Sequence, residues 1–308
     1  MGRCRVLVIG SANMDLIIQA DHIPAPGETV LGGRFQTARG GKGANQAVAC
    51  ARLGAETWFL GRVGSDAFGD ELAAGLVADG VDCSWLRRDD EPTGVAMIVV
   101  DARGENSIVV APGANSRVSC EDLDAVADWS FFDAVLFQLE VPLETIAEAA
   151  RRARGAGCLT VLDAGPPALL PEDMYPYLSV ISPNETETRM LLGLAPEGEV
   201  DLGSACQEFI ALGAGAVVLK LGAEGALVAT SGGQRYEVPA FKVRPIDTTG
   251  AGDAFTAALA VALAEGMSLE EATRFACAAG ALATTKMGAA PSMPKRAEVE
   301  EFLAGQEE

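Results

Sequence analysis

Histidine is almost absent from this sequence, because His22 is the only one among its 308 residues. A metal site built from several imidazoles, or a proton relay between two of them, is therefore excluded. His22 lies in the stretch ADHIPAPGE, whose prolines and glycine indicate an exposed loop, and we expect a structural role for it. Acid–base chemistry in this chain is then expected from a carboxylate.

Basic residues are also scarce. The chain has 43 Asp and Glu against 23 Lys and Arg, a formal net charge of −20. Such a charge repels polyphosphate backbones and anionic lipid surfaces, so neither a nucleic acid nor a membrane is expected as a partner. An anionic ligand must be held by a local group of donors that overrides the global charge.

Paired cysteines and long apolar runs are missing as well. The seven cysteines are far apart, form no C-x-x-C pair and are odd in number, which fits neither a zinc site nor a secreted disulfide framework. No apolar run reaches membrane-spanning length. We therefore expect a cytoplasmic protein.

What the sequence does contain is an alternation of short apolar, β-branched runs with longer segments of helical period. This pattern is typical of parallel strands buried on both faces, and it predicts an α/β fold, a three-layer sandwich around a mostly parallel sheet. Because no repeat or charged linker interrupts it, residues 1–308 are interpreted as a single domain. The strand candidates are residues 5–10, 57–64, 133–138, 159–165, 180–184 and 216–222.

Two segments break the alternation. Residues 16–36 and 94–110 both have a strand–turn–strand pattern with no helix between the strands. Together they predict a small antiparallel sheet that projects from the main body. Such a sheet has one apolar face that needs cover, so it is expected to be either a lid over a pocket or a subunit interface.

The segment Asp247-Thr-Thr-Gly-Ala-Gly-Asp253 comes directly before a long apolar helix candidate. Gly250 and Gly252 allow backbone N–H groups to converge at the helix N-terminus, which is a favourable place for an anion. A carboxylate beside a phosphate-binding site is repulsive unless it acts as a general base, which is the role we assign to Asp253. The alternative is an ordinary helix start in which the acid compensates the helix dipole.

A second glycine-rich segment, Gly40-Gly-Lys-Gly-Ala-Asn-Gln46, also opens a helix candidate. Lys42 and Asn45 offer polar contacts suited to a small polyhydroxylated ligand, and the alternative is a tight turn into a helix. The segment is not a Walker loop, because Lys42 is followed by glycine, and no dinucleotide fingerprint follows Gly252.

Two further polar groups follow strand candidates. Asn13 and Asp15 come just after the first strand, at the end where open α/β sheets bind ligands. Asn184 and Glu187 follow the strand around residue 181, and an amide with a carboxylate suits Mg²⁺ and its waters. A helix cap formed by the same two residues is an equally good interpretation.

The order N-x-D, GGKGANQAVA, QLE-x-P, NETE, LG-x-x-G and DTTGAGD resembles the ribokinase-like carbohydrate kinase family, from about residue 5 to residue 303. The resemblance implies an α/β sandwich with a β-lid, and the conversion of ATP and D-ribose into ADP and ribose 5-phosphate. Activation by a monovalent cation and a homodimer formed through the lid are implied too. Lys220 and Cys277 depart from some relatives, in which threonine and histidine or asparagine can stand.

The resemblance also implies roles for individual residues. Asp253 would be the catalytic base, with Gly250, Ala251 and Gly252 as the anion hole. The sugar would be held by Asn13, Met14, Asp15, Gly41, Lys42, Gly43, Ala44, Asn45, Glu140 and Asp253. The nucleotide would be held by Asn184, Lys220, Leu221, Gly222, Ala223, Glu224, Gly225, Gly252 and Cys277. Glu187 would lie near Mg²⁺, and K⁺ would be bound by Asp247, Thr249, Ala283, Lys286, Gly288 and Ser292.

Other functions remain open at this point. A kinase for 2-deoxyribose, fructose or a nucleoside such as adenosine would use the same chemistry with a different pocket. A dehydrogenase is disfavoured by the missing fingerprint, and a non-catalytic sugar-binding module by the presence of Asp253 with both glycine-rich segments.

Overall fold

A nine-stranded sheet forms the centre of the computed structural model, which describes residues 3–195 and 200–306. The order of its strands is β13-β12-β11-β10-β9-β8-β1-β4-β5, and the pairs are parallel except for β11 with β12 and β12 with β13. The mostly parallel sheet is thus confirmed. Its strands are β1 (Arg5–Ile9), β4 (Glu56–Gly64), β5 (Val81–Asp89), β8 (Ala134–Phe137), β9 (Leu159–Asp163), β10 (Val180–Ser182), β11 (Ala216–Lys220), β12 (Gly225–Thr230) and β13 (Arg235–Pro239).

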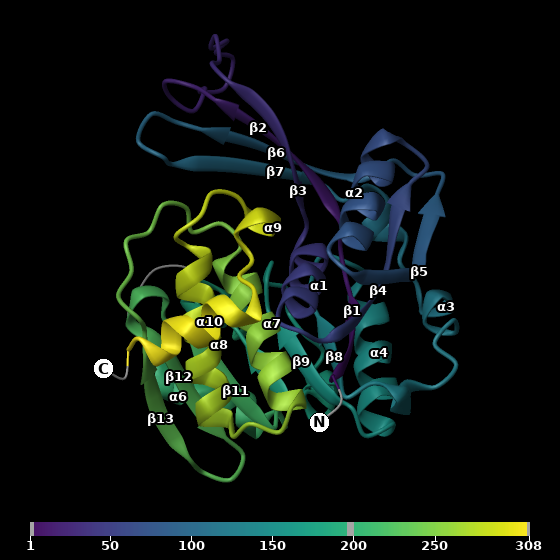
Figure 1. Ribbon diagram of the computed structural model, residues 1–308, viewed down its shortest axis with the longest axis vertical. Coiled ribbons are helices and arrows are strands. Elements are labelled where there is room, and N and C mark those ends of the chain that lie inside the picture. The colour runs from purple at the N-terminus through teal and green to yellow at the C-terminus, as the bar shows by residue number, and fades with distance from the viewer. Residues whose placement is uncertain (1–2, 196–199, 307–308) are drawn as a thin grey trace.

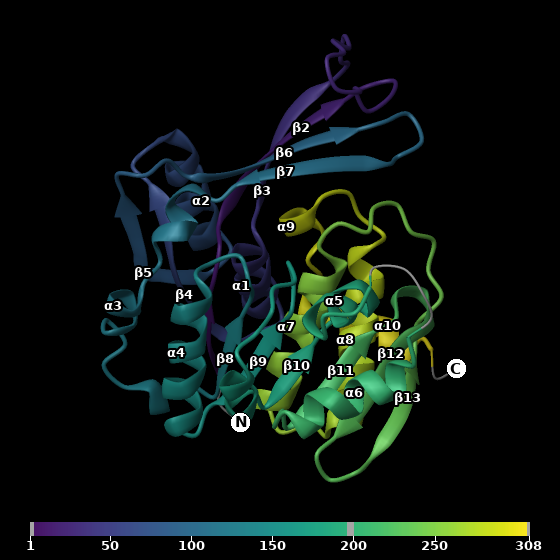
Figure 2. The same cartoon turned by 180° about the vertical axis from the view of Figure 1, so that it is seen from behind.

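Helices cover both faces of this sheet and complete the three layers (Figures 1 and 2). One face carries α1 (Lys42–Arg52), α2 (Ala67–Ala78), α7 (Ala251–Ala264), α8 (Leu269–Ala283) and α10 (Arg296–Ala304). The other carries α3 (Cys120–Leu123), α4 (Leu143–Gly155), α5 (Glu185–Leu191) and α6 (Leu202–Ala211), and the short α9 (Ala289–Ser292) follows α8. Each face has its own apolar core, because successive side chains of the central strands point to opposite sides.

The helix ends follow local sequence rules. α8 begins with a capping box, in which the Ser268 hydroxyl accepts the N–H of Glu271 and the Glu271 carboxylate accepts the N–H of Ser268. α7 is rich in alanine and is buried from Asp253 to Ala262, so it packs closely between α1 and α8. Its N-terminus is therefore held in a fixed position relative to α1.

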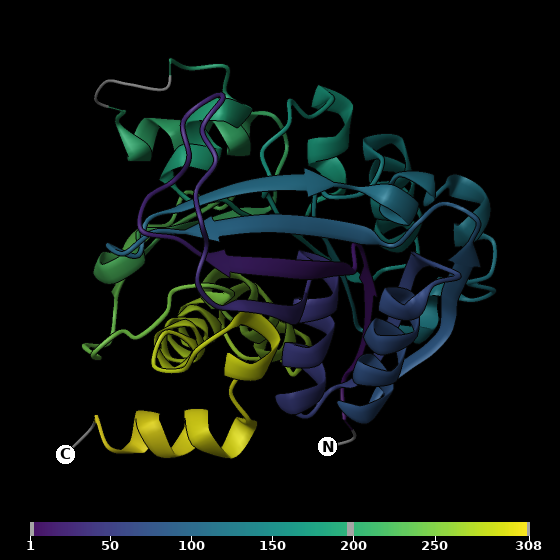
Figure 3. The ribbon, with the colours of Figure 1, turned by 90° about the horizontal axis from the view of Figure 1, so that it is seen from above.

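A second, four-stranded sheet rises above the edge at which the parallel strands end (Figures 1 and 3). It contains β2 (Asn13–Gln19), β3 (Phe35–Gly40), β6 (Gly94–Val100) and β7 (Asn106–Ala111) in the order β3-β2-β6-β7. The segments 16–36 and 94–110 thus meet in one small sheet, as expected. Two antiparallel hairpins form it, and their inner strands β2 and β6 pair in parallel, so the sheet is mixed and not antiparallel throughout.

The cysteines and the single histidine have simple surroundings. The seven cysteines are all free thiols. His22 is exposed and its Nε2 lies 2.8 Å from Glu28 Oε1. Within residues 3–195 and 200–306, no helix is both long and apolar enough to cross a bilayer.

Candidate active site

Asp253 lies in the first turn of α7, and its carboxylate is buried. It accepts hydrogen bonds from Asn45 Nδ2 at 2.9 Å and Gln46 Nε2 at 3.2 Å, and Lys42 Nζ is 3.4 Å away. These donors all come from α1, on the opposite side of the carboxylate from its own helix. The second glycine-rich segment therefore holds the Asp253 carboxylate. An acid that only compensated the helix dipole would not need these contacts.

Two glycines bring the helix starts this close. Gly250 precedes α7 with φ +79°, and a Cβ there would lie 2.9 Å from Met293 Cε. Gly41 precedes α1 with φ +89°, and a Cβ there would lie 2.7 Å from the backbone nitrogen of Asn13. Both positions need a left-handed conformation and a close approach, which favour glycine strongly.

Two further carboxylates lie near Asp253. Glu140 Oε2 accepts the backbone N–H of Lys42 at 3.0 Å and the hydroxyl of Ser11. Burial raises the pKa of Glu140, and the negative charge of Asp253 adds to this effect. Burial, together with the charges of Glu140 and Asp253, raises the pKa of Asp15 to about 7. Such clustered carboxylates are suited to accept hydrogen bonds from the hydroxyl groups of a sugar.

Other residues expected at the sugar have their side chains elsewhere. The side chain of Asn13 is buried, and its Oδ1 accepts a hydrogen bond from Asn115 Nδ2 at 2.7 Å. Met14 and Ala44 pack in the apolar core. Asn13 and Met14 therefore shape the wall behind Asp15, which follows them on β2.

A cavity of about 600 Å³ lies beside the N-terminus of α7, and Asp253 is not part of its wall. Most of its wall is apolar or glycine. The residues expected at the nucleotide that line it are Lys220, Gly222, Ala223, Gly225, Gly252 and Cys277, and Ala251 of the expected anion hole lines it too. The sequence interpretation missed the rest of the wall, formed by Ala240, Phe241, Lys242, Val243, Pro245, Thr248, Phe255, Gly280, Ala281 and Thr284.

Three residues expected at the nucleotide lie outside the lining of this cavity. Leu221 packs against the apolar core, and Glu224 is exposed. Asn184 caps α5, since its Oδ1 accepts the N–H of Glu187 at 2.8 Å and the Glu187 carboxylate accepts the N–H of Asn184 at 2.8 Å. The capping interpretation of this pair is thus confirmed.

The Glu187 carboxylate also points toward the site. It is buried, Oε2 lies 3.9 Å from Lys220 Nζ, and a Cβ on Gly165 would collide with Oε1. Burial raises the pKa of Glu187, with a further contribution from the charge of Asp163. The carboxylate therefore caps a helix and faces the end of β9 at the same time.

The segments expected to bind a monovalent cation lie side by side. Asp247 accepts the N–H of Thr249 at 2.9 Å and that of Gly288 at 2.8 Å, so it joins the chain before α7 to the chain after α8. The Ser292 hydroxyl donates to the carbonyl of Ala289, and the Lys286 ammonium pairs with Glu298. Within the described part of the chain, no group of three or more His, Cys, Asp or Glu side chains could hold a metal.

A further residue that the sequence interpretation missed is Asp163, at the end of β9. It is fully buried and contacts Lys42 Nζ at 3.5 Å and Lys220 Nζ at 3.2 Å. Gln46 Nε2 and the Thr256 hydroxyl donate to the same carboxylate at 2.9 and 3.2 Å. An acid that ends an apolar strand at the ligand-binding edge of the sheet was the signal that could have identified it.

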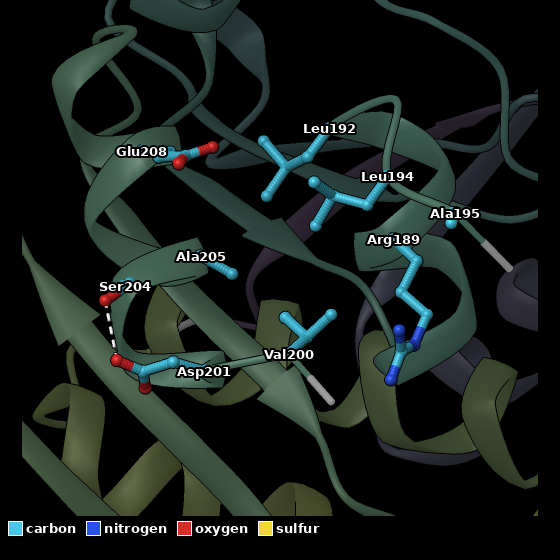
Figure 4. A pocket seen from close by; sticks show the side chains of 9 residues that line it. All are labelled: Arg189, Leu192, Leu194, Ala195, Val200, Asp201, Ser204, Ala205 and Glu208. Carbon is cyan, nitrogen blue, oxygen red and sulfur yellow. Dashed lines mark hydrogen bonds between the residues drawn. The ribbon is translucent and has the colours of Figure 1, made fainter. Parts of the chain in front are cut away.

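A separate cavity of about 320 Å³ lies between α5 and α6 (Figure 4). Its walls include Arg189, Leu192 and Glu208, and Ser204 donates to Asp201 at 2.6 Å. None of the residues expected from the sequence to bind sugar, nucleotide or cation lines it. The candidate active site is therefore the region around Asp253.

The buried Asp253 at a glycine-rich helix start, the polar side chains around it and the neighbouring 600 Å³ cavity define a kinase of small hydroxylated molecules. Comparisons with known proteins agree. The model of the pfkB family carbohydrate kinases matches residues 4–296, so the chain belongs to this family. Within it, the chain is similar to the ribokinases of Haemophilus influenzae, at 40% identity over 98% of this chain and 99% of the relative, and Bacillus subtilis, at 40% identity over 97% and 99%. The structure of Arabidopsis thaliana ribokinase complexed with ribose and ATP covers 98% of this chain and 99% of that one, with 36% identity and a TM-score of 0.89.

Proposed function

We propose that this chain transfers the γ-phosphoryl group of ATP to the 5-hydroxyl of D-ribose, giving ADP and ribose 5-phosphate. One observation carries the proposal: a buried carboxylate, Asp253, stands between the sugar-side carboxylates and the 600 Å³ cavity. The ribokinase relatives and the Arabidopsis ribokinase complexed with ribose and ATP support the two substrates.

In this proposal the chemistry is a single in-line step. Asp253 removes the proton of the 5-hydroxyl, the hydroxyl oxygen forms a bond to the γ-phosphorus, and the bond from that phosphorus to the ADP oxygen breaks. The N–H groups at Gly250, Ala251 and Gly252 face the charge that develops on the transferred group, as in other anion sites at helix N-termini. Lys42 and Asn45 orient the acid and the sugar from α1.

On the sugar side, Asp15 and Glu140 are proposed to bind hydroxyl groups of the ribose, together with the backbone of Gly41, Gly43 and Ala44. The raised pKa values of both acids support this, because a carboxylate that is destabilised when empty gains more from hydroxyl donors. Asn13 and Met14 are proposed to act by holding Asp15 in place.

Mg²⁺ is proposed to lie near Glu187, which would hold it through bound waters. A single carboxylate fits this ion, because Mg²⁺ usually combines one or two carboxylates with substrate phosphates and waters. When bound, the ion would neutralise charge on the ATP phosphates.

K⁺ is proposed to bind between the segments that Asp247 joins. Because the side chains of Asp247, Lys286 and Ser292 already have partners, backbone carbonyl groups around residues 247–249 and 283–292 are the suitable ligands. Hard oxygen donors of this kind suit an alkali cation. The ion would stabilise the loop that opens α7.

We also propose that residues 1–308 form one domain with the four-stranded sheet as its lid. Because Phe35, Met97 and Val109 of this sheet and Leu31 of the chain between β2 and β3 are exposed, a homodimer through the lid is proposed as well. Sedimentation of the wild type and of Val109→Glu tests this: a dimer that the substitution dissociates is expected, and a monomeric wild type would contradict it.

The free cysteines support a reducing compartment, which we take to be the cytoplasm.

The function is tested by ADP release with ribose, 2-deoxyribose, fructose and adenosine, each measured in K⁺ and in Na⁺. Ribose is expected to be the best acceptor, with higher activity in K⁺. Activity confined to fructose or adenosine would contradict the proposed substrate, and equal rates in the two salts would contradict the cation site.

A further inference from the structure

Asp163 connects two lysines that lie on different sides of the α7 N-terminus. Lys42 Nζ is 3.5 Å from Asp163 Oδ2 and 3.4 Å from Asp253, on the sugar side. Lys220 Nζ is 3.2 Å from Asp163 Oδ1, and Lys220 lines the nucleotide cavity. One carboxylate therefore fixes an ammonium group at each end of the path that a phosphoryl group would follow.

The position of Lys220 is close to the anion hole itself. A Cβ on Gly252 would lie 3.8 Å from Lys220 Nζ, so the ammonium faces the second glycine of the turn that opens α7. Its side chain is only 11% exposed, and Lys220 ends β11, where it pairs with Asn184 in an isolated parallel bridge. In a chain with net charge −20, such an enclosed cation is a strong local attraction for phosphate oxygens.

Asp163 has contacts that stabilise its ionised form. Burial would raise its pKa, but the ammonium groups of Lys220 and Lys42 reverse this effect and hold the pKa below its usual value. Gln46, Thr256 and the N–H of Gly165 supply further donors. An acid that is buried this completely is tolerated only when it is fully paired, so the two lysines and Asp163 depend on one another.

From this arrangement we infer that Lys220 is a further catalytic residue, which neutralises charge on the phosphoryl group during its transfer, and that Asp163 is the positioning residue that holds Lys220 and Lys42. This inference rests on the proposed function. It goes beyond nucleotide binding, because it assigns Lys220 to the transition state, in which negative charge is spread over the equatorial oxygens of the transferred group. No proton moves to or from Lys220 in this step.

The test uses the full chain with Lys220→Met, Asp163→Asn and the double variant, and Lys295→Met as the matched control. Lys295 is exposed at the start of α10 and is not part of the cavity lining. For each protein, kcat, the KM values for ATP and ribose, and the Kd and stoichiometry of ADP binding are measured. The stoichiometry gives the folded, competent fraction, so kcat is expressed per intact site and a loss of folding is not read as a loss of catalysis.

Lys220→Met is expected to lower kcat about 10²-fold, the usual size of a lost donor to a developing charge, and to change the Kd of ADP less than about threefold. Asp163→Asn is expected to lower kcat as well, and adding Lys220→Met to it should cost at most a few-fold more, because the lysine has already lost its position. Lys295→Met should match the wild type.

An unchanged kcat in Lys220→Met, whatever happens to the KM for ATP, would overturn the catalytic role. Fully multiplicative losses in the double variant would overturn the positioning role of Asp163. The wild type is assayed first with the four acceptors. Failure with ribose would contradict the proposed substrate alone, because the variants are then compared on the acceptor that is phosphorylated.

Discussion

The two sides of the α7 N-terminus recognise ligands in different ways. On the sugar side, polar side chains are enclosed: Asn45 is buried and Glu140 half-buried, both are oriented by hydrogen bonds, and Asp15 is half-buried beside them. On the nucleotide side, small residues, glycines and apolar groups such as Phe241 and Cys277 form most of the cavity wall. Selection by buried polar groups is sharp, because an unmatched group loses its partner, whereas an apolar wall discriminates weakly. We therefore expect substitutions to be costly on the first side and, apart from Lys220, mild on the second.

The largest effect is expected where the two sides meet. Asp253→Asn should leave the fold intact and lower kcat by about 10²–10⁴, since an amide cannot take the proton of the hydroxyl. Steady-state ADP release with ribose measures it. Asp70→Asn is the matched control, because Asp70 also lies in the first turn of a helix but its side chain is 77% exposed. Retention of more than a tenth of the turnover in Asp253→Asn would show that Asp253 only compensates a helix dipole.

The second prediction concerns the sugar side alone. Asp15→Asn should raise the KM for ribose roughly 10- to 100-fold, the value of one hydrogen bond to a charged group, and leave the KM for ATP nearly unchanged. Asp21→Asn, in the exposed chain after β2, serves as the control. An equal change in both KM values would show that the two sides are not separate.

The sequence predicted the two sides unequally, and the reason is physical. Both glycine-rich helix starts were found because a left-handed turn followed by a helix leaves a local signature at Gly41 and Gly250. The chain before and inside α7 and α8 that forms the nucleotide wall carries no such signature, since residues such as Phe241 and Ala281 look like ordinary core. A glycine-rich turn with polar residues leaves a pattern in the sequence, whereas residues that only shape a cavity do not.

The same limit explains the missed strands and the missed acid. The six strand candidates correspond to β1, β4, β8, β9, β10 and β11. The strands β5 and β13 have exposed faces and no continuous apolar run, whereas β12 is buried and apolar, so its pattern could have predicted it. Asp163 ends the apolar run of β9, and its importance depends on Lys42 and Lys220, which are distant in the sequence. The end of an apolar strand marks Asp163 as a candidate, but its contacts with two distant lysines cannot be found from local patterns.

The third prediction uses the pKa of Asp15. Because the folded protein raises this pKa to about 7, from an unfolded value of about 4, the ionised carboxylate destabilises the sugar-free fold. The penalty is absent below about pH 4, grows as the pH rises, and is complete above about pH 7. Asp15→Asn should thus melt a few degrees above the wild type at pH 8, with a difference that shrinks toward pH 4.

Thermal melts of both proteins from pH 4 to 8 check this prediction, with Asp21→Asn as the control. A constant difference across the pH range would mean that Asp15 is not the titrating group. Together with the loss of ribose affinity, the expected result would show that the sugar side trades stability for binding.

The smallest effect is expected on the nucleotide side. The Cys277 thiol is 6% exposed and burial raises its pKa to about 12, so it stays neutral and acts as a small apolar group in the wall. Cys277→Ala removes about the packing of one methylene, which corresponds to less than about fivefold in the KM for ATP. Cys206→Ala, at a buried cysteine of α6, is the control for stability. If Cys277→Ala instead lowered kcat as much as Asp253→Asn does, the wall would take part in the transfer, and the division between a selective sugar side and a permissive nucleotide side would fail.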